Sequence, residues 1–81
     1  MVVSVEFYGA QRKLTRTREV KVPVLENGRV RDVAEYIAHR YPELILDDEN
    51  FLVIVNNKVS SLNHTLKYKD KIAFLPHIGG G

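Results

Sequence analysis

Cysteine is absent from the chain of 81 residues. A protein without thiols has no disulfide scaffold, no thiolate zinc site, no iron–sulfur cluster and no cysteine nucleophile. Long apolar runs are also missing, because none approaches the roughly 18 to 20 residues that a membrane helix needs. The first residues alternate between polar and apolar types, which is not the pattern of a signal peptide. We therefore expect a cytoplasmic protein with no membrane partner.

A large excess of charge of one sign is missing as well. Twelve basic and ten acidic side chains give a net charge of +2, which is too small to indicate a nucleic-acid partner by itself. The charges are unevenly distributed, with five basic residues and one acidic residue in range 12–21 and an acidic cluster within 43–49. We interpret range 12–21 as a basic, solvated loop, in preference to a phosphate-binding patch.

Arrangements of side chains that are typical of catalysis are not found. The three histidines, His39, His64 and His77, are isolated along the chain, and no pair has metal-ligand spacing. The acidic residues 47–49 lack the glycine and the ligand alternation of a calcium loop. The sequence contains no nucleophile elbow, metalloprotease motif, P-loop or dinucleotide fingerprint. We therefore predict no metal site, no bound cofactor and no catalytic side chain.

Two segments near the N-terminus have the alternation of β-strands. In range 2–8 the residues Val3, Val5 and Phe7 share one face, and in range 19–24 three valines do the same. The two strands are expected to form a hairpin. Pro23 cannot donate a ladder hydrogen bond, so the second strand is predicted to lie at a sheet edge or to turn its proline nitrogen outward.

One amphipathic helix is predicted over residues 30–41. Apolar residues recur there with the spacing i, i+3, i+4, i+7 and i+11, which places them on a single face. Pro42 ends the helix, because proline disfavours helical geometry in the residue before it. Arg29 is a weak capping residue, so Asn27 is the better candidate for the N-cap.

The second half of the chain is predicted to hold three more strands. Range 51–55 is a continuous apolar run, as expected for a strand covered on both faces, and a turn at 56–58 leads into a short strand at Val59. Leu62 and Leu66 punctuate an irregular segment before the last strand, at 72–75. The length suits one compact core. The element order predicts an α+β fold of the β-grasp (ubiquitin-like) type, with a mixed sheet of four to five strands and one main helix.

The C-terminus carries the most specific feature of the sequence, the run of glycines at 79–81. Three terminal glycines occur by chance in about 1 in 3,000 chains at average glycine usage. Glycine has no Cβ, so such a segment can enter a channel that excludes other residues. We predict a β-grasp domain over 1–78 and a flexible tail over 79–81, with a frayed end as the alternative.

Taken with the strand order, this C-terminal segment resembles the MoaD/ThiS family of ubiquitin-like sulfur carriers. In that family a leucine, a polar turn, an apolar strand and a terminal Gly-Gly follow in this order, and the matching positions are Leu66, Asp70, Ile72, Phe74, Pro76, Gly80 and Gly81. The segments VEFYGAQRKL and VRDVAEYIAHRYPEL also look like the first strand and the helix of MoaD. Three positions depart from the pattern. Lys69 stands where a turn glycine is usual, and His77 stands where MoaD often has a second proline. Gly79 is a third glycine, which is more typical of ThiS than of MoaD.

The resemblance implies chemistry at the chain end. An activating enzyme of the MoeB/ThiF type would use Mg-ATP to adenylate the carboxylate of Gly81, and sulfur would then displace AMP to leave a thiocarboxylate. Gly79 and Gly80 would thread into the enzyme. The carrier would bind no cofactor itself, and the sulfur would pass to the large subunit of molybdopterin synthase or to another acceptor enzyme.

The residues before the tail, together with Arg12, are expected to dock the partners. Alternation in the last strand buries Ile72 and turns Ala73 and Leu75 outward. Phe74, although expected in the core, is included in the docking set, which is Phe74, Leu75, His77, Ile78 and Arg12.

The function expected from the resemblance is sulfur donation in the synthesis of molybdopterin, the molybdenum or tungsten cofactor. Length, the FYGAQRKL segment and Leu75-Pro76 favour this pathway. The alternatives are a ThiS-like carrier for thiamine thiazole synthesis, a ubiquitin-like protein modifier or tRNA-thiolation carrier, and a plain binding module that uses the basic loop.

Overall fold

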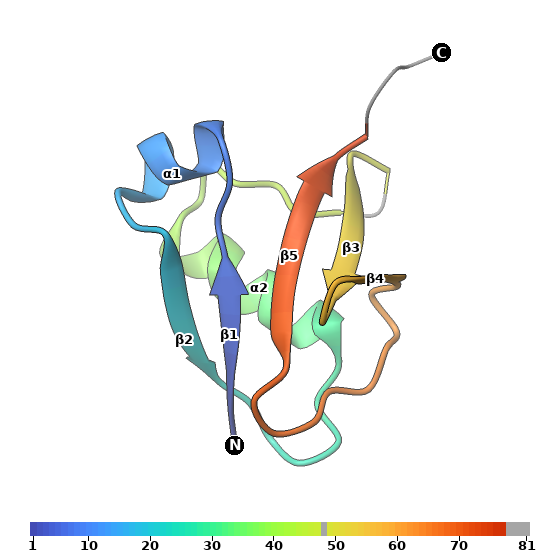
Figure 1. The fold of residues 1–81 in the computed structure, drawn as a ribbon. Helices are drawn as coiled ribbons and strands as arrows, with labels where there is room; N and C mark the ends of the chain where they lie inside the picture. The colour runs from blue at the N-terminus through green and yellow to red at the C-terminus, as the bar shows by residue number, and fades with distance from the viewer. Residues whose placement is uncertain (48, 78–81) are drawn as a thin grey trace.

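A computed structural model of the protein describes residues 1–47 and 49–77. Five strands and two helices lie within these residues. They follow in the order β1 (Val2–Glu6), α1 (Ala10–Thr15), β2 (Glu19–Pro23), α2 (Val30–Arg40), β3 (Phe51–Val55), β4 (Lys58–Ser60) and β5 (Lys71–Pro76). Figure 1 shows the strands side by side with α2 behind them. The predicted tail at 79–81 lies outside the described residues.

The strands form one mixed sheet in the order β2-β1-β5-β3-β4. β1 and β5 are parallel, whereas the pairs β1–β2, β3–β4 and β3–β5 are antiparallel. The first and last strands of the chain are therefore neighbours at the centre of the sheet, as the β-grasp prediction requires. Pro23 ends the edge strand β2, where a missing N–H leaves no gap in the ladder.

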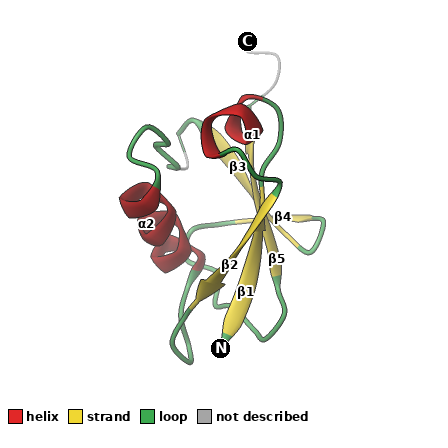
Figure 2. Cartoon of the chain, turned by 90° about the vertical axis from the view of Figure 1, so that its left-hand side faces the viewer, coloured by secondary structure: helices red, strands yellow, loops and turns green. Residues whose placement is uncertain are grey.

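The hydrophobic core lies between α2 and one face of the sheet (Figure 2). Val5 and Phe7 from the N-terminal segment, Val33 and Ile37 from α2, and Phe74 from β5 are each at most 1% exposed. Burying side chains of this size stabilises the fold by about 1.5 to 3 kcal/mol each. The alternation in the sequence thus predicted the buried face of the sheet correctly.

Helix α2 matches the predicted range, but its N-terminus is capped differently from the expectation. The Asp32 carboxylate accepts a hydrogen bond of 2.8 Å from the Arg29 N–H, so the third helical residue satisfies the N-cap backbone. Asn27 instead occupies a turn with φ 65°, and the prediction that it caps the helix is wrong. Asn27 forms the Asn-Gly turn that precedes the helix, and Arg29 occupies the N-cap position instead.

The basic stretch at 12–21 is not a plain loop, because it begins within helix α1 and ends within β2. The helix ends at Thr15, and Arg16 is its C-cap. Arg16 has the left-handed φ of 59°, and the Arg16 N–H donates to the carbonyl of Arg12. Thr15 is buried, and its hydroxyl donates to the carbonyl of Gln11. β1 and β2 pair as antiparallel neighbours, as predicted for a hairpin, and α1 forms part of the connection between them.

The two faces of β3 differ in burial, in contrast to the prediction that both are covered. Val53 and Val55 are buried in the core, whereas Leu52 and Ile54 on the other face are only half-buried. The helix covers one face of the sheet and leaves the other open (Figure 2). No helix in the described part of the chain is long and apolar enough to cross a membrane.

Candidate functional site

The open face of the sheet carries a shallow groove of about 440 Å³ beside β5. Its apolar side chains come from β3 and β5, namely Ile54, Ala73 and Leu75. Polar side chains surround them: Glu6, Tyr8, Asn56, Asn57 and Lys71. An apolar centre with a polar rim is the composition of a protein-docking surface.

The structure separates the residues that were expected to dock partners. Leu75 is half-buried and lines the groove, and Ala73 lies beside it on the same face but is only 8% exposed. Ala73 is therefore part of the groove floor, not a projecting side chain. Phe74 is 1% exposed, because alternation along β5 turns its side chain into the core. The assignment of Phe74 to the docking set is wrong.

The rim next to β1 is built by an aromatic ring and two charges. The Tyr8 hydroxyl donates a hydrogen bond to the Glu6 carboxylate, and this bond is the main reason why the pKa of Tyr8 is raised. Burial and the Glu6 charge raise the pKa of Tyr8 further, and the Arg12 charge opposes them. The Arg12 guanidinium lies 5.5 Å from the centre of the Tyr8 ring, and its Nε donates to the Phe7 carbonyl. Arg12 is thus exposed but held beside the groove, compatible with its predicted docking role.

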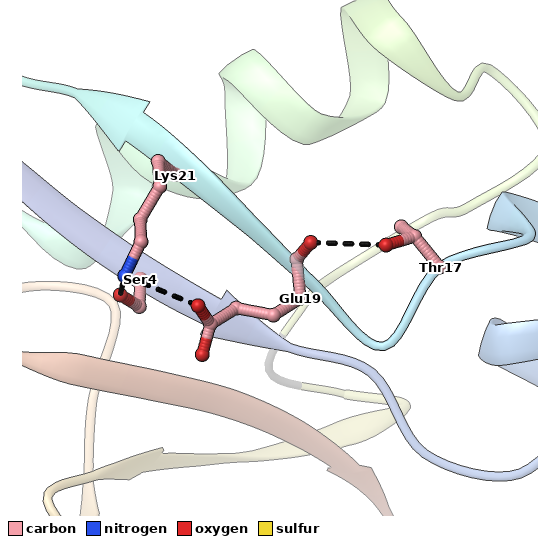
Figure 3. Close-up of polar contacts among 4 residues, drawn as sticks. All are labelled: Ser4, Thr17, Glu19 and Lys21. Atoms are coloured by element: carbon pink, nitrogen blue, oxygen red, sulfur yellow. Dashed lines mark hydrogen bonds and ion pairs between the residues drawn. The ribbon is translucent and has the colours of Figure 1, made fainter.

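The open face changes character between β1 and β2. Lys21 Nζ donates a hydrogen bond of 2.9 Å to Ser4 Oγ and lies 3.1 Å from the Glu19 carboxylate, while the Thr17 hydroxyl donates to the Glu19 carbonyl (Figure 3). The Lys21 side chain thereby extends across the surface beside Ser4. No residue of β2 lines the groove, so the groove ends at β1 and these polar contacts lie beside it.

A buried carboxylate fixes the turn that leads into β5. Asp70 is 7% exposed, and its two oxygens accept hydrogen bonds of 2.8 Å from the Lys67 N–H and from Asn56 Nδ2. Lys69 has φ 68°, so it adopts the backbone conformation that a glycine favours. The departure from the family pattern at Lys69 therefore leaves a left-handed turn in place. The family resemblance included Asp70 among the matching positions. Its structural role, joining the turn at Asn56 to the turn before β5, follows from its burial and its hydrogen bonds.

The end of β5 leads toward the predicted reactive terminus. Pro76 ends the strand at the same end of the sheet as α1 (Figure 1), and His77 is exposed. Ile78, Gly79, Gly80 and Gly81 lie outside the described residues, so their predicted roles stay predictions. Within residues 1–47 and 49–77 no three His, Asp or Glu side chains are grouped so that they could hold a metal ion.

Five strands in this order, one helix across one face and a groove beside the last strand define a ubiquitin-like protein of the β-grasp fold. The chain belongs to the ThiS family, whose model matches residues 5–81, and it is thus a MoaD/ThiS-type ubiquitin-like sulfur carrier. A search of curated proteins gives no match.

Three solved structures illustrate the similarity. A molybdopterin converting factor subunit 1 from Pyrococcus furiosus has 25% identity and a TM-score of 0.83, with 95% of this chain and 98% of that chain covered. Small archaeal modifier protein 1 from Haloferax volcanii has 18% identity and the same TM-score and coverage. A chain from the complex of molybdopterin-converting factor subunits 1 and 2 from Helicobacter pylori 26695 has 22% identity, a TM-score of 0.61 and full coverage of both chains. The last two matches support the fold alone.

Proposed function

We propose that the C-terminal Gly81 is adenylated and converted to a thiocarboxylate, and that the chain supplies no catalytic side chain. The observation that carries the proposal is the reach of the ThiS family match, which runs from residue 5 through the terminal glycines to residue 81. The domain over 1–78 would dock partners, and the tail over 79–81 would enter their active sites.

The chemistry follows from the properties of a carboxylate. The terminal carboxyl group has a pKa of roughly 3.3 to 3.7, so near neutral pH it is an anion and a poor electrophile. In the proposed step a Gly81 oxygen attacks the α-phosphorus of Mg-ATP, and pyrophosphate leaves. Hydrosulfide from the sulfur donor then attacks the acyl carbon, and the carbon–oxygen bond to AMP breaks, so that AMP leaves and the thiocarboxylate remains. ATP and magnesium belong to an activating enzyme of the MoeB/ThiF type, and the carrier binds neither by itself.

The pathway that we propose is molybdopterin synthesis, with the large subunit of molybdopterin synthase as the sulfur acceptor. The similarity to the Pyrococcus furiosus converting factor subunit supports this assignment, as do the segment FYGAQRKL and the pair Leu75-Pro76. In the Helicobacter pylori structure, subunit 1 of that factor forms a complex with subunit 2. Thiazole synthesis, for which Gly79 is the supporting feature, and lysine modification are the competing outcomes.

The decisive experiment measures intact mass after incubation with the activating enzyme from the same organism, Mg-ATP and a sulfur donor. We expect the mass to rise by the difference between sulfur and oxygen. A matched control with one residue added after Gly81 keeps the fold but presents its carboxylate at a different position, and we expect no mass change. Ladders of larger species on a gel would instead indicate a protein modifier, and an unchanged mass in both chains would indicate a binding module.

Two substitutions test the tail independently of its terminal group. Gly80→Val adds a β-branched side chain to the segment that must thread, and we expect ATP–pyrophosphate exchange near background. Gly79→Ala adds a single methyl group, and we expect a mild loss. Equal activity of the two variants would argue against a narrow channel.

A further inference from the structure

The side-chain amide of Gln11 lies between β1 and β5, at the point where the two strands separate. Gln11 belongs to α1 and is 7% exposed. Its Oε1 accepts a hydrogen bond of 3.2 Å from the Tyr8 N–H, and its Nε2 donates one of 2.8 Å to the Phe74 carbonyl. A single side chain thus connects the residues after β1 with the strand that leads to the tail.

The sheet register shows what this amide replaces. Ser4 N–H donates to the Asp70 carbonyl, and the parallel pairing advances by equal steps from Ser4↔Lys71 to Glu6↔Ala73. In a parallel ladder the same donor-to-acceptor offset recurs every second residue. Four residues further along both strands from the Ser4–Asp70 hydrogen bond, the same offset would join the Tyr8 N–H directly to the Phe74 carbonyl. Those are the two groups that the Gln11 amide bridges, so its side chain stands in for a missing rung of the sheet.

Replacing a direct backbone hydrogen bond with the Gln11 amide has a geometric consequence for β5. An inserted amide adds a second hydrogen bond and its own width to the gap, so β1 can diverge from β5 into Tyr8 and Gly9 while the Phe74 carbonyl keeps a partner. On its other side β5 continues in register with β3 as far as Phe51↔Pro76. Beyond Ala73 the strand is therefore held by β3 on one side and by Gln11 on the other.

We propose that Gln11 is a positioning residue: its amide fixes the course of β5 past Ala73 and thereby aims the C-terminal tail into the activating enzyme. The part that concerns the tail rests on the proposed function, whereas the part that concerns β5 does not. Gln11 does not touch the reacting carboxylate. Its effect is exerted through Phe74 and the two residues that follow before the strand ends.

The variants are chosen to separate this role from general stability. Gln11→Met keeps a long unbranched side chain but removes both hydrogen bonds, and Gln11→Asn keeps the amide but is too short to span both partners. Thr15→Val is the matched control, because Thr15 is also buried on α1 and its hydroxyl bonds backbone groups of Gln11 and Thr17: it donates to their carbonyls and accepts from the Thr17 N–H. The control removes polar contacts of α1 without touching β5.

The first measurement uses residual dipolar couplings of backbone N–H groups and needs no enzyme. In both Gln11 variants we expect the couplings of Ile72 and Ala73 to fit the structure and those of Leu75 and His77 to depart from it. All four should fit in Thr15→Val. Unchanged couplings of Leu75 and His77 in Gln11→Asn and Gln11→Met would overturn the proposal. Two variants are measured so that poor folding of one leaves the other to decide.

The second measurement is ATP–pyrophosphate exchange with the activating enzyme, with the carrier as the varied substrate. A misdirected tail should lower kcat about tenfold or more while docking, reported by KM, changes less than about threefold. Thr15→Val should leave both values near wild type. A raised KM with unchanged kcat would assign Gln11 to docking and overturn its positioning role. If the wild type shows no exchange, the proposed function fails, and the dipolar couplings alone decide whether Gln11 directs β5.

Discussion

Leu75 offers the sharpest test of the groove as a docking surface, through the substitution Leu75→Glu. The side chain is half-buried in the free protein and lines the groove beside Ala73 and Ile54. It lies opposite Leu52 of β3 on the open face. Since part of the side chain is already in water, the free protein should lose about 1 kcal/mol, which is roughly half the value of a fully buried leucine.

A bound partner makes the same change much more costly. When the groove is covered, Leu75 loses its remaining contact with water, so the variant forfeits about another 1 kcal/mol of apolar burial. A glutamate there also has to shed its hydration or push the partner away, and such central positions commonly cost about 2 kcal/mol or more. A loss of about 2 to 3 kcal/mol corresponds to a Kd raised about 30- to 150-fold.

The assay is titration calorimetry of the carrier against the activating enzyme, with Leu25→Glu as the matched control. Leu25 is also a leucine, is 84% exposed in the segment after β2, and lies outside the residues that line the groove. Leu25→Glu introduces the same charge, so we expect a Kd within about threefold of wild type. Equal Kd values for the two variants, with both shown to be folded by circular dichroism, would refute the groove as the docking face. The rim at Arg12 would then be the next candidate.

Three further predictions concern stability. Ile37→Asp places an unpaired carboxylate at a fully buried position, so the thermal transition should disappear, and a native-like transition would contradict the core described for α2. Asp70→Ala removes the acceptor of two hydrogen bonds and should lower the free energy of unfolding by about 2 to 4 kcal/mol in urea titration, whereas a loss below about 1 kcal/mol would show that water replaces the carboxylate. Lys69→Gly relieves a left-handed backbone and should stabilise by about 0.5 to 1 kcal/mol in the same titration; a loss of stability would mean that the Lys69 contact with the Tyr68 ring outweighs the strain.

The strands β1 and β2 and the main helix α2 could be predicted from the sequence because each carries a simple apolar period, whereas the continuous apolar run of β3 indicated a strand but not which of its faces is buried. Residues 2–8 and 30–41 indicated the correct faces, since one side of each element meets the core. α1 could not be predicted in the same way. It is short and basic, and its two buried side chains, Gln11 and Thr15, are polar residues whose burial depends on hydrogen bonds within α1, to the backbone after β1 and to β5.

The candidate site was predictable only where it lies on a single strand. Alternation along β5 predicted that Leu75 faces away from the core, and the same rule excludes Phe74 from the docking surface. The groove itself needs Ile54 from β3 and Tyr8 after β1 to lie beside Leu75. That proximity follows from the pairing of β5 with strands that are distant in the sequence, which no local pattern indicates.

In the proposed function β5 serves both docking and delivery, and its placement in the sheet supports this double role. β5 is flanked by β1 and β3, its first residue follows a turn held by Asp70, and its last residues are held by Gln11 through Phe74. Leu75, which lines the groove, is adjacent to the last residue of the strand. A partner that fixes Leu75 therefore also fixes the point from which the chain continues toward Gly81. In the proposed function, docking at Leu75 would bring the terminal carboxylate nearer to its reaction partners, although no side chain of the carrier takes part in the proposed reaction.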